Sequence, residues 1–408
     1  MLGPYGPFWV RNRMNPVDLD ELRIDASAHL ASFKELMSMP RETVPQMTAI
    51  AARKALVAAA GELDLELVEK EGITPTFLLL PRGGATPSLT LFSTWHAEAH
   101  PVTPAAVEGA ERLALAATLG AASALVSAGA GLPAVVVAPA SGQGSLPLEG
   151  HLRQHREALQ ASVAFWPRIA PSATRRRRVC LGARGRVILG VWGEEANPYA
   201  IRDQLIAKLG DEAYGPRPLD FELLRKLAQS AGALDFLEET LEDPHAVRGD
   251  GEAKLRGALF EPRGQVVRPQ VRHADRPQAW IIVETAEQME PADVAKRAQA
   301  LAGTTKIEMA EGFLWDRVNI HHPAAQAAIR TAKSRSEGAE IWPMAPWVTP
   351  SGLFTRSLGT PLMEWGVPLP RGAAIRFPNA EALQEIEREM AELFLRGMGA
   401  LKTAVQET

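Results

Sequence analysis

The fold is decided by the stretch Ser88-Leu-Thr-Leu-Phe-Ser-Thr-Trp-His-Ala-Glu-Ala-His-Pro101, an apolar run that ends in two histidines and a carboxylate. Apolar and β-branched residues without helical spacing predict a strand buried on both faces. In open α/β sheets, ligands bind at the carboxyl ends of such strands. On a strand, His96, Glu98 and His100 would share one face and could bind zinc if a second element supplies further ligands. The alternative is a polar loop that caps the strand end.

Helical and extended patterns alternate after this stretch. The sequence predicts an alanine-rich helix over 104–128, a strand over 134–138, a helix ending at 160 and a strand over 162–166. Before it, helices are expected over 18–39 and 46–60, and strands over 65–69 and 76–80. Strand, helix and strand at these lengths predict a parallel, doubly wound sheet.

The middle of the chain has a different pattern of residues. Residues 175–192 combine basic and apolar residues and predict one long antiparallel-type strand. Asn197 and Pro198 predict the start of a helix, with asparagine as its N-cap. A strand over 279–284 and a helix over 291–301 follow, so this region is interpreted as an inserted α+β domain.

The last part returns to the α/β pattern. A helix is expected over 323–334, with His321 and His322 at its N-terminal flank, and a strand over 361–366. An amphipathic helix over 380–401 closes the chain. The arginine block 175–178 is interpreted as a solvated face, with an anion-binding patch as the alternative.

Composition limits the classes of function. The 44 basic and 48 acidic residues leave a formal net charge of −4, which does not favour nucleic acid or an anionic membrane as partner. The one cysteine, Cys180, excludes an intrachain disulfide framework and a cysteine-based zinc cluster. No stretch reads as a signal peptide or a membrane span, so a cytoplasmic protein is expected.

Two further segments are candidates for binding. Glu108 and Glu111 lie near the start of the expected helix over 104–128, where the helix dipole favours carboxylates whether or not they bind a metal. The loop Ser141-Gly-Gln-Gly-Ser145 could hold an anion on its backbone amides. It lacks the lysine of a phosphate-binding loop, and no Gly-x-Ser-x-Gly nucleophile elbow occurs in the chain.

Taken in order, these segments resemble the co-catalytic zinc metallopeptidase family that includes carnosinase-type dipeptidases, aminoacylase, succinyl-diaminopimelate desuccinylase and carboxypeptidase G. In that family a strand ends in His-x-Asp and proline, which resembles His96-Ala-Glu98-Ala-His-Pro101. The next helix begins with a ligand motif similar to Val107-Glu-Gly-Ala-Glu111. The resemblance runs from about Ala28 to the end of the chain and includes Asn197-Pro198 and the segment 354–366.

Four positions depart from the family pattern. Ser141 and Gly142 stand where the resemblance places the general base and one ligand, Pro167 stands for an aspartate ligand and Arg376 for the last histidine. Two zinc ions about 3.5 Å apart need a bridging carboxylate, further ligands and a base. The replacements remove most of the negative charge that such a pair requires, and an arginine in the site opposes metal binding.

The resemblance therefore implies a metallopeptidase-like or amidohydrolase-like pseudoenzyme that has lost most zinc ligands and the general base. It would bind a small amino-acid or peptide-like ligand without hydrolysing it, and no cofactor is expected. Arg376 is expected to hold a ligand carboxylate with its bidentate fork. The expected ligand-binding residues are Ser141, Gln143, Arg168 and Arg376.

Two alternatives remain open from the sequence. The first is an active single-metal peptidase or amidohydrolase, of the dipeptidase or N-acyl amino acid deacylase type, with zinc as its cofactor. Its metal ligands would come from His96, Glu98, His100 and Glu111. The second is a dimeric scaffold protein without a ligand in its cleft.

The expected fold class is α/β, a doubly wound zinc-peptidase-like domain with an inserted α+β lid or dimerisation domain. Residues 1–179 and 321–408 would form the peptidase-like domain, and residues 180–320 the inserted one. Because the inserted domain of the family often mediates dimerisation, the resemblance implies a homodimer.

Overall fold

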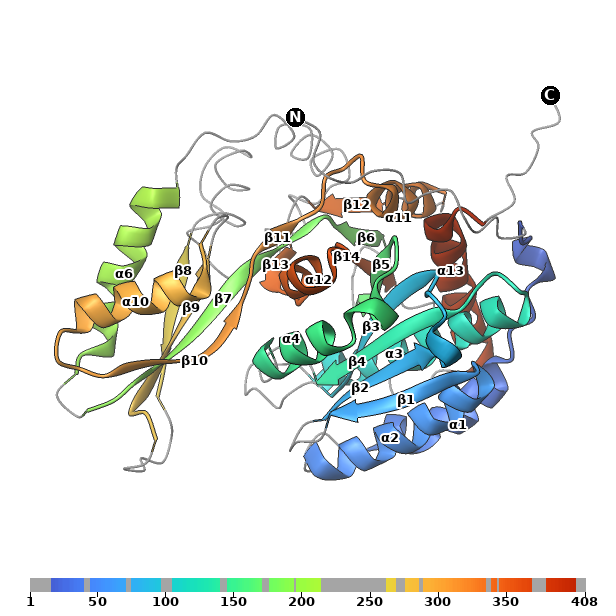
Figure 1. Cartoon of the computed structure of the whole chain (residues 1–408), viewed down its shortest axis with the longest axis horizontal. Helices are drawn as coiled ribbons and strands as arrows, with labels where there is room; N and C mark the ends of the chain where they lie inside the picture. Colours follow the sequence, from blue (N-terminus) through green and yellow to red (C-terminus); the bar gives the residue numbers. More distant parts are fainter. Residues whose placement is uncertain are drawn as a thin grey trace.

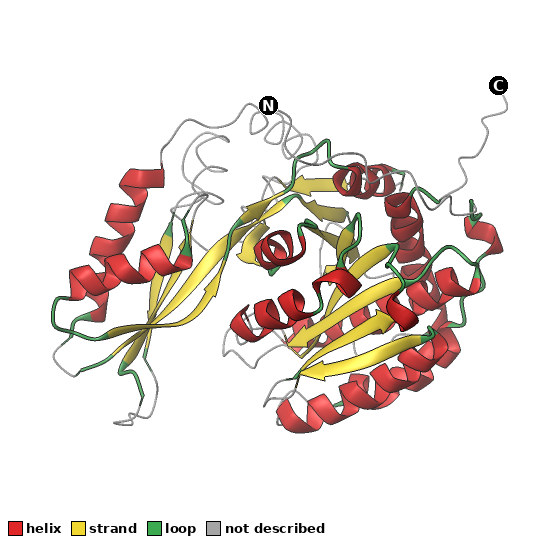
Figure 2. Ribbon diagram, in the orientation of Figure 1, coloured by secondary structure: helices red, strands yellow, loops and turns green. Residues whose placement is uncertain are grey.

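The computed structural model describes residues 16–39, 45–70, 75–96, 105–139, 145–170, 176–193, 196–213, 262–268, 276–285, 289–334, 339–342, 345–368 and 379–400. Two sheets with their helices make up this part of the chain, a larger one and a smaller one joined by the long strand β7 (Figure 1). Helices flank the strands of the larger sheet (Figure 2). No helix in the described ranges combines the length and the hydropathy needed to cross a membrane.

The larger sheet has eight strands in the order β1-β2-β4-β3-β5-β14-β6-β12. Its strands are β1 (Leu65–Lys70), β2 (Thr76–Pro81), β3 (Leu89–His96), β4 (Pro133–Pro139), β5 (Ala164–Ala170), β6 (Arg177–Cys180), β12 (Ala339–Trp342) and β14 (Leu362–Pro368). β3 is parallel to β4 and β5, and β5 is parallel to β14. The described side chains of β3 and β4 are all buried, as expected for apolar strands covered on both faces.

Helices cover both faces of this sheet. One face packs against α1 (Ala26–Ser38), α2 (Pro45–Glu62), α3 (Ala105–Ser127), α11 (Pro323–Lys333) and α13 (Ala380–Met398). The other face packs against α4 (Ser145–Gln154), α5 (Arg156–Leu159) and α12 (Ser351–Leu358). The short 3-10 helices η1 (Leu19–Glu21) and η2 (Arg82–Gly84) complete this half. The expected doubly wound α/β architecture is thus confirmed. The sheet is mixed and not purely parallel as predicted, because β1–β2, β2–β4 and β6–β14 pair antiparallel.

The smaller sheet is built around β7 (Gly182–Val191), which pairs antiparallel with β9 (Ala279–Thr285) and β10 (Ile307–Phe313). β8 (Arg263–Val267) extends the sheet beyond β9, and β11 (Asp316–Arg317) and β13 (Ala345–Val348) pair with the start of β7. Helices α6 (Pro198–Ala213) and α10 (Pro291–Ala302) share one apolar core with this sheet. The domain boundaries at residues 180 and 320 remain a prediction. Strand β13 lies after residue 320 and still pairs with β7.

Local signals in the sequence predicted two helix starts correctly. The side chain of Asn197 accepts hydrogen bonds from the backbone amides of Tyr199 and Ala200, so it caps α6. His322 accepts from the amide of Ala324 and caps α11 in the same way. These caps confirm the expected helix starts.

Three expectations were wrong in part. The helix expected over 18–39 begins only at Ala26, because Asp25 caps it and the residues before it form η1. The long strand expected over 175–192 is two strands separated by Leu181, of which β6 belongs to the larger sheet and β7 to the smaller one. Arg177 and Arg178 are buried and paired with glutamates, so these two arginines of the block do not form a solvated face, whereas Arg176 is half-buried.

A buried histidine–glutamate pair joins the first and last helices. His29 Nδ1 of α1 lies 2.8 Å from Glu387 Oε1 of α13, and both side chains are buried. Gly120 of α3 lies against them, and a Cβ at this position would meet the carboxylate and the imidazole. A larger residue here would have to displace the carboxylate of Glu387 or the imidazole of His29 from the pair.

Candidate functional site

Four charged or small residues form a row across neighbouring strands of the larger sheet. The register aligns Arg168 of β5 with Gly366 of β14, Gly366 with Arg178 of β6, and Arg178 with Glu340 of β12. Cross-strand neighbours in register point to the same face of a sheet. Because glycine has no side chain, β14 places nothing between the two arginines at this level.

A second row lies two residues away in each strand and therefore on the same face. It aligns Trp166 of β5 with Glu364 of β14, Glu364 with Cys180 of β6, and Cys180 with Trp342 of β12. All four side chains are buried. The two rows together bring arginine, glutamate and tryptophan side chains to one region of the sheet.

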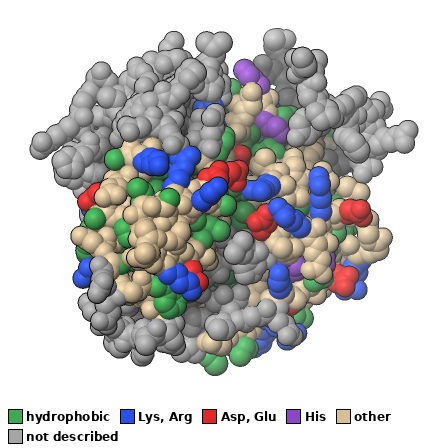
Figure 3. Space-filling view, turned by 60° about the vertical axis from the view of Figure 1, so that its left-hand side comes forward, with side chains coloured by type: hydrophobic (Ala, Val, Ile, Leu, Met, Phe, Trp, Pro, Cys, Tyr) green, Lys and Arg blue, Asp and Glu red, His purple; other side chains and the backbone are tan. Residues whose placement is uncertain are grey.

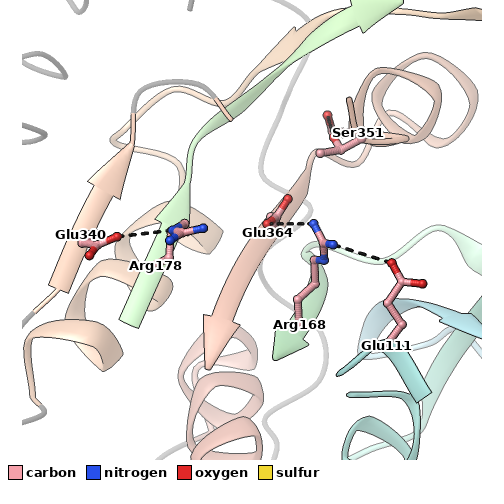
Figure 4. A network of polar contacts seen from close by, with 7 residues as sticks. Glu111, Arg168, Arg178, Glu340, Ser351 and Glu364 are labelled. Atoms are coloured by element: carbon pink, nitrogen blue, oxygen red, sulfur yellow. Dashed lines mark hydrogen bonds and ion pairs between the residues drawn. The ribbon is translucent and has the colours of Figure 1, made fainter. Parts of the chain in front are cut away.

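Arg168 connects the sheet to helix α3. Its guanidinium Nη1 lies 3.5 Å from Glu364 Oε1, and its Nη2 lies 3.7 Å from Glu111 Oε1 (Figure 4). Both carboxylates are buried, whereas 22% of the arginine side chain is exposed. The arginine can therefore contact a solute while it compensates two buried carboxylates.

Each of the two arginines in the row stacks on a tryptophan. The guanidinium carbon of Arg168 lies 4.8 Å from the ring centroid of Trp166, and that of Arg178 lies 4.8 Å from the ring centroid of Trp342. Arg178 also pairs with Glu340, with 3.3 Å between Nε and Oε2. Stacking of this kind fixes the plane of a guanidinium and so pre-organises its donors.

Cys180 lies among these charges but is not poised as a nucleophile. Burial raises the pKa of its thiol well above the usual value, and the charge of Glu364 raises it further. Arg178 and Arg168 act in the opposite sense with smaller effects. A thiol held neutral at physiological pH is a poor nucleophile, because the thiolate is the reactive form.

We expect Cys180 to resist thiol reagents in the folded protein. Ellman's reagent at pH 7.5 should label no thiol in the native chain and one thiol per chain in guanidinium chloride, because the chain has one cysteine. Rapid labelling of the native protein would contradict the neutral, buried thiol. The denatured sample serves as the control for reagent and protein concentration.

The structure brings together two of the residues expected at the site, Arg168 and Glu111. His96 forms the end of β3, and only its backbone is described. Five expected residues lie outside the described residues: Glu98, His100, Ser141, Gln143 and Arg376. Their roles remain predictions.

Sequence reasoning missed the two glutamates that pair with the arginines. Glu364 and Glu340 are buried in short strands whose other residues are mostly apolar. A single carboxylate within an apolar strand was the available signal, because a buried charge needs a partner. The partners could not be read from the sequence, since Arg168 is 196 residues from Glu364.

The described residues alone do not fit a zinc centre. Among them there is no group of three or more histidine, cysteine, aspartate or glutamate side chains that could hold a metal ion. Glu111, the described side chain among the expected metal ligands, faces the guanidinium of Arg168 instead. A fixed positive charge beside a carboxylate opposes a metal ion on the same carboxylate.

Comparisons with known proteins identify the fold. No protein-family model matches the sequence, and none of the curated proteins matches it significantly. The dipeptidase Dug1p from Saccharomyces cerevisiae superposes with a TM-score of 0.65 at 12% identity, over 91% of this chain and 96% of that chain. Human carnosine dipeptidase 1 superposes with a TM-score of 0.61 at 13% identity, over 92% and 97% of the two chains.

A third solved structure agrees with these two. The M20 family metallo-carboxypeptidase Sso-CP2 from Sulfolobus solfataricus superposes with a TM-score of 0.60 at 13% identity, over 86% of this chain and 96% of that chain. The chain therefore has the fold of M20 metallopeptidases, as the sequence resemblance predicted. At such identities the likeness defines the fold, whereas the chemistry has to be argued from the residues of the site.

Proposed function

We propose that this metallopeptidase-like chain binds a small amino-acid or peptide-like ligand and does not hydrolyse it. The observation that carries the proposal is the position of Arg168 between Glu111 and Glu364. A guanidinium there supplies the positive charge that a metal ion would otherwise supply to buried carboxylates. A ligand with both an ammonium and a carboxylate group matches a site that presents both glutamate and arginine.

The proposal also rests on the substitutions predicted from the sequence. Ser141, Gly142, Pro167 and Arg376 stand at positions where the resemblance expects a base or ligands. Without a carboxylate base, a water molecule in the site would not be activated for attack on an amide. In this proposal the site keeps the binding function of the fold and loses the hydrolytic step.

Metal analysis and ligand binding test the proposal together. Protein purified without chelator, and again after addition and removal of excess zinc, should hold well below one zinc ion per chain and should not cleave L-alanyl-L-leucine or carnosine. L-alanyl-L-leucine at 100 times its Kd should stabilise the fold by about 2.7 kcal/mol, which thermal unfolding detects. Stoichiometric zinc together with dipeptide cleavage would overturn the proposal.

A matched pair of variants assigns the binding to the site. Arg168→Gln removes the guanidinium that contacts both glutamates, so it should abolish the thermal shift caused by L-alanyl-L-leucine. Arg53→Gln is the control, because Arg53 pairs with Glu69 at an exposed position on α2. A full thermal shift in Arg168→Gln would place the ligand elsewhere.

The second candidate is an active single-metal peptidase or amidohydrolase. The observation in its favour is the superposition on solved dipeptidases and on a metallo-carboxypeptidase. It predicts bound metal that is lost together with hydrolytic activity in His96→Ala. The third candidate, a dimeric scaffold, predicts no thermal shift with any of these solutes.

Homodimer formation and a cytoplasmic location complete the proposal. They follow from the sequence resemblance and from the cysteine usage, and neither depends on the geometry of the site. Sedimentation of the purified chain at several concentrations would measure the oligomeric state.

A further inference from the structure

Leu181 is the residue at which the chain leaves the larger sheet for the smaller one. It lies between β6 and β7, and Figure 1 shows β7 running from one sheet to the other. The amide of Leu181 donates to the carbonyl oxygen of Trp342 over 2.9 Å, and its own carbonyl accepts from the amide of Val318 over 2.6 Å. The side chain of Leu181 is buried in the core that packs α3 and α13 on the larger sheet. A hinge residue must change its backbone angles, and here such a change would break two buried hydrogen bonds.

The chain returns to the larger sheet through residues 314–317, whose backbone is approached closely from two sides. On one side, a Cβ at Gly182 of β7 would lie 2.6 Å from the carbonyl oxygen of Asp316. On the other side, a Cβ at Gly352 of α12 would lie 2.6 Å from the carbonyl oxygen of Leu314. Both glycines thus allow a backbone approach that a side chain would prevent. Residues 314–317 with Gly182 and Gly352 are called the clamp below.

Side chains and strand pairing reinforce the clamp. The hydroxyl of Thr355 on α12 donates to Oδ2 of Asp316 over 2.8 Å, and the side chain of Asp316 is buried. Leu314 packs in the same apolar core as α12 and the larger sheet. At the start of β7, Ala183 pairs with Asp316 of β11 and with Ala345 of β13. One end of the smaller sheet is therefore built into the packing of the larger domain.

One exposed ion pair also joins the two parts of the molecule. Arg356 Nη1 of α12 lies 3.1 Å from Oε2 of Glu290, the residue before α10, and the two side chains are 50% and 54% exposed. Acidic and basic side chains also lie close together on the face shown in Figure 3. Exposed pairs of this kind contribute little to stability. The orientation of the two sheets is therefore held by the buried clamp rather than by surface charge.

We propose that the larger and the smaller sheet form one rigid frame, and that the smaller domain does not close over a ligand as a lid. Domain closure needs a few residues that absorb a large change in backbone angles. Within the described ranges, the passage out at Leu181 and the passage back at 314–317 are both packed against the larger domain. The opening of the site is then set by the fold, and a ligand binds to a preformed arrangement. This inference goes beyond the proposed function, because it concerns the chain with and without a ligand.

Distances between spin labels test the rigid frame. The labels are attached to Glu157→Cys and Lys208→Cys, at exposed positions on α5 of the larger domain and α6 of the smaller one. Cys180 is buried and should stay unlabelled, which labelling of the unsubstituted chain checks. Double electron–electron resonance should give a single distance maximum that L-alanyl-L-leucine moves by less than about 2 Å. Two maxima in the free chain, or a larger shift with the dipeptide, would overturn the rigid frame.

Matched glycine variants of the labelled chain test the clamp. Gly352→Val places a branched side chain against the carbonyl of Leu314, so the distance distribution should broaden or shift. Gly61→Val is the control and should leave the distribution unchanged, because a Cβ at Gly61 of α2 meets nothing within 4 Å. A distribution in Gly352→Val equal to that of the control would overturn the role of the clamp.

Hydrogen exchange of the unlabelled chain is a second measurement, which decides if Gly352→Val does not fold. The amides of Leu181 and Val318 should exchange as slowly as those of β4, which is paired on both sides, because their opening requires unfolding of the surrounding core. Much faster exchange at Leu181 and Val318 than in β4 would reveal a local opening and contradict the rigid frame. Absence of dipeptide binding would overturn the proposed function alone, since the free chain still tests this inference.

Discussion

Replacing Arg177 with methionine is expected to lower the free energy of unfolding by about 3–5 kcal/mol, because a buried carboxylate then loses its counter-charge. Arg177 lies in β6 and binds Glu389 of α13 with three hydrogen bonds of 2.8–3.2 Å. Both side chains are almost completely buried, at 7% and 3% exposure. Urea unfolding followed by circular dichroism measures the change as a lower midpoint at an unchanged slope.

The double variant Arg177→Met and Glu389→Leu separates the net contribution of the ion pair from the cost of leaving one of its charges unpaired. Removing both charges should restore most of the lost stability, since apolar residues of similar volume often replace buried ion pairs without loss. Arg53→Met is the surface control, because the Arg53–Glu69 pair is 62% and 26% exposed and should change the stability by less than about 1 kcal/mol. A loss of less than about 1 kcal/mol in Arg177→Met would show that Glu389 finds another counter-charge.

The arginine block shows that local sequence patterns do not predict contacts between residues far apart in the chain. Apolar runs such as 134–138, and caps such as Asn197, predicted their elements because the signal lies within a few residues. The block at 175–178 reads locally as a charged surface, yet the partner of Arg177 is 212 residues away on α13. Pairing at that distance is decided by the order of strands in the sheet, which local patterns do not encode.

For the candidate site, too, the sequence predicted residues but not the contacts between them. Glu111 and Arg168 were each expected near the ligand, but as a metal ligand and as a cleft residue, not as partners. Their contact depends on the packing of α3 against β5. The parallel pairing of β5 with β14 places Arg168 beside β14. The resemblance could supply candidate positions, whereas the charge balance between them required the fold.

Acidification from pH 6.5 to about 4 is expected to cost the fold about 3 kcal/mol through His151 alone. His151 of α4 is buried, and burial lowers its pKa to about 4, with smaller effects from the charges of His155 and Lys70. In the unfolded chain the imidazole has a pKa of about 6.5, so between these pH values the unfolded state binds a proton that the folded state does not. The stability due to neutral His151 is therefore present above pH 6.5 and is lost as the pH falls to about 4.

The variant His151→Leu isolates this effect. Its free energy of unfolding should fall between pH 7 and pH 4 by about 3 kcal/mol less than that of the wild type. His321→Leu, at an exposed position, should keep the wild-type difference. Comparison of variants is needed because other groups also titrate. Burial raises the pKa of Glu387, so this residue acts in the opposite sense to His151 above pH 4.5. The raised pKa of His29 gives a stabilisation that is complete below pH 6.5 and is lost only as the pH rises above that value. Equal pH dependence in His151→Leu and the wild type would mean that His151 takes up its proton without unfolding, through a local opening of α4.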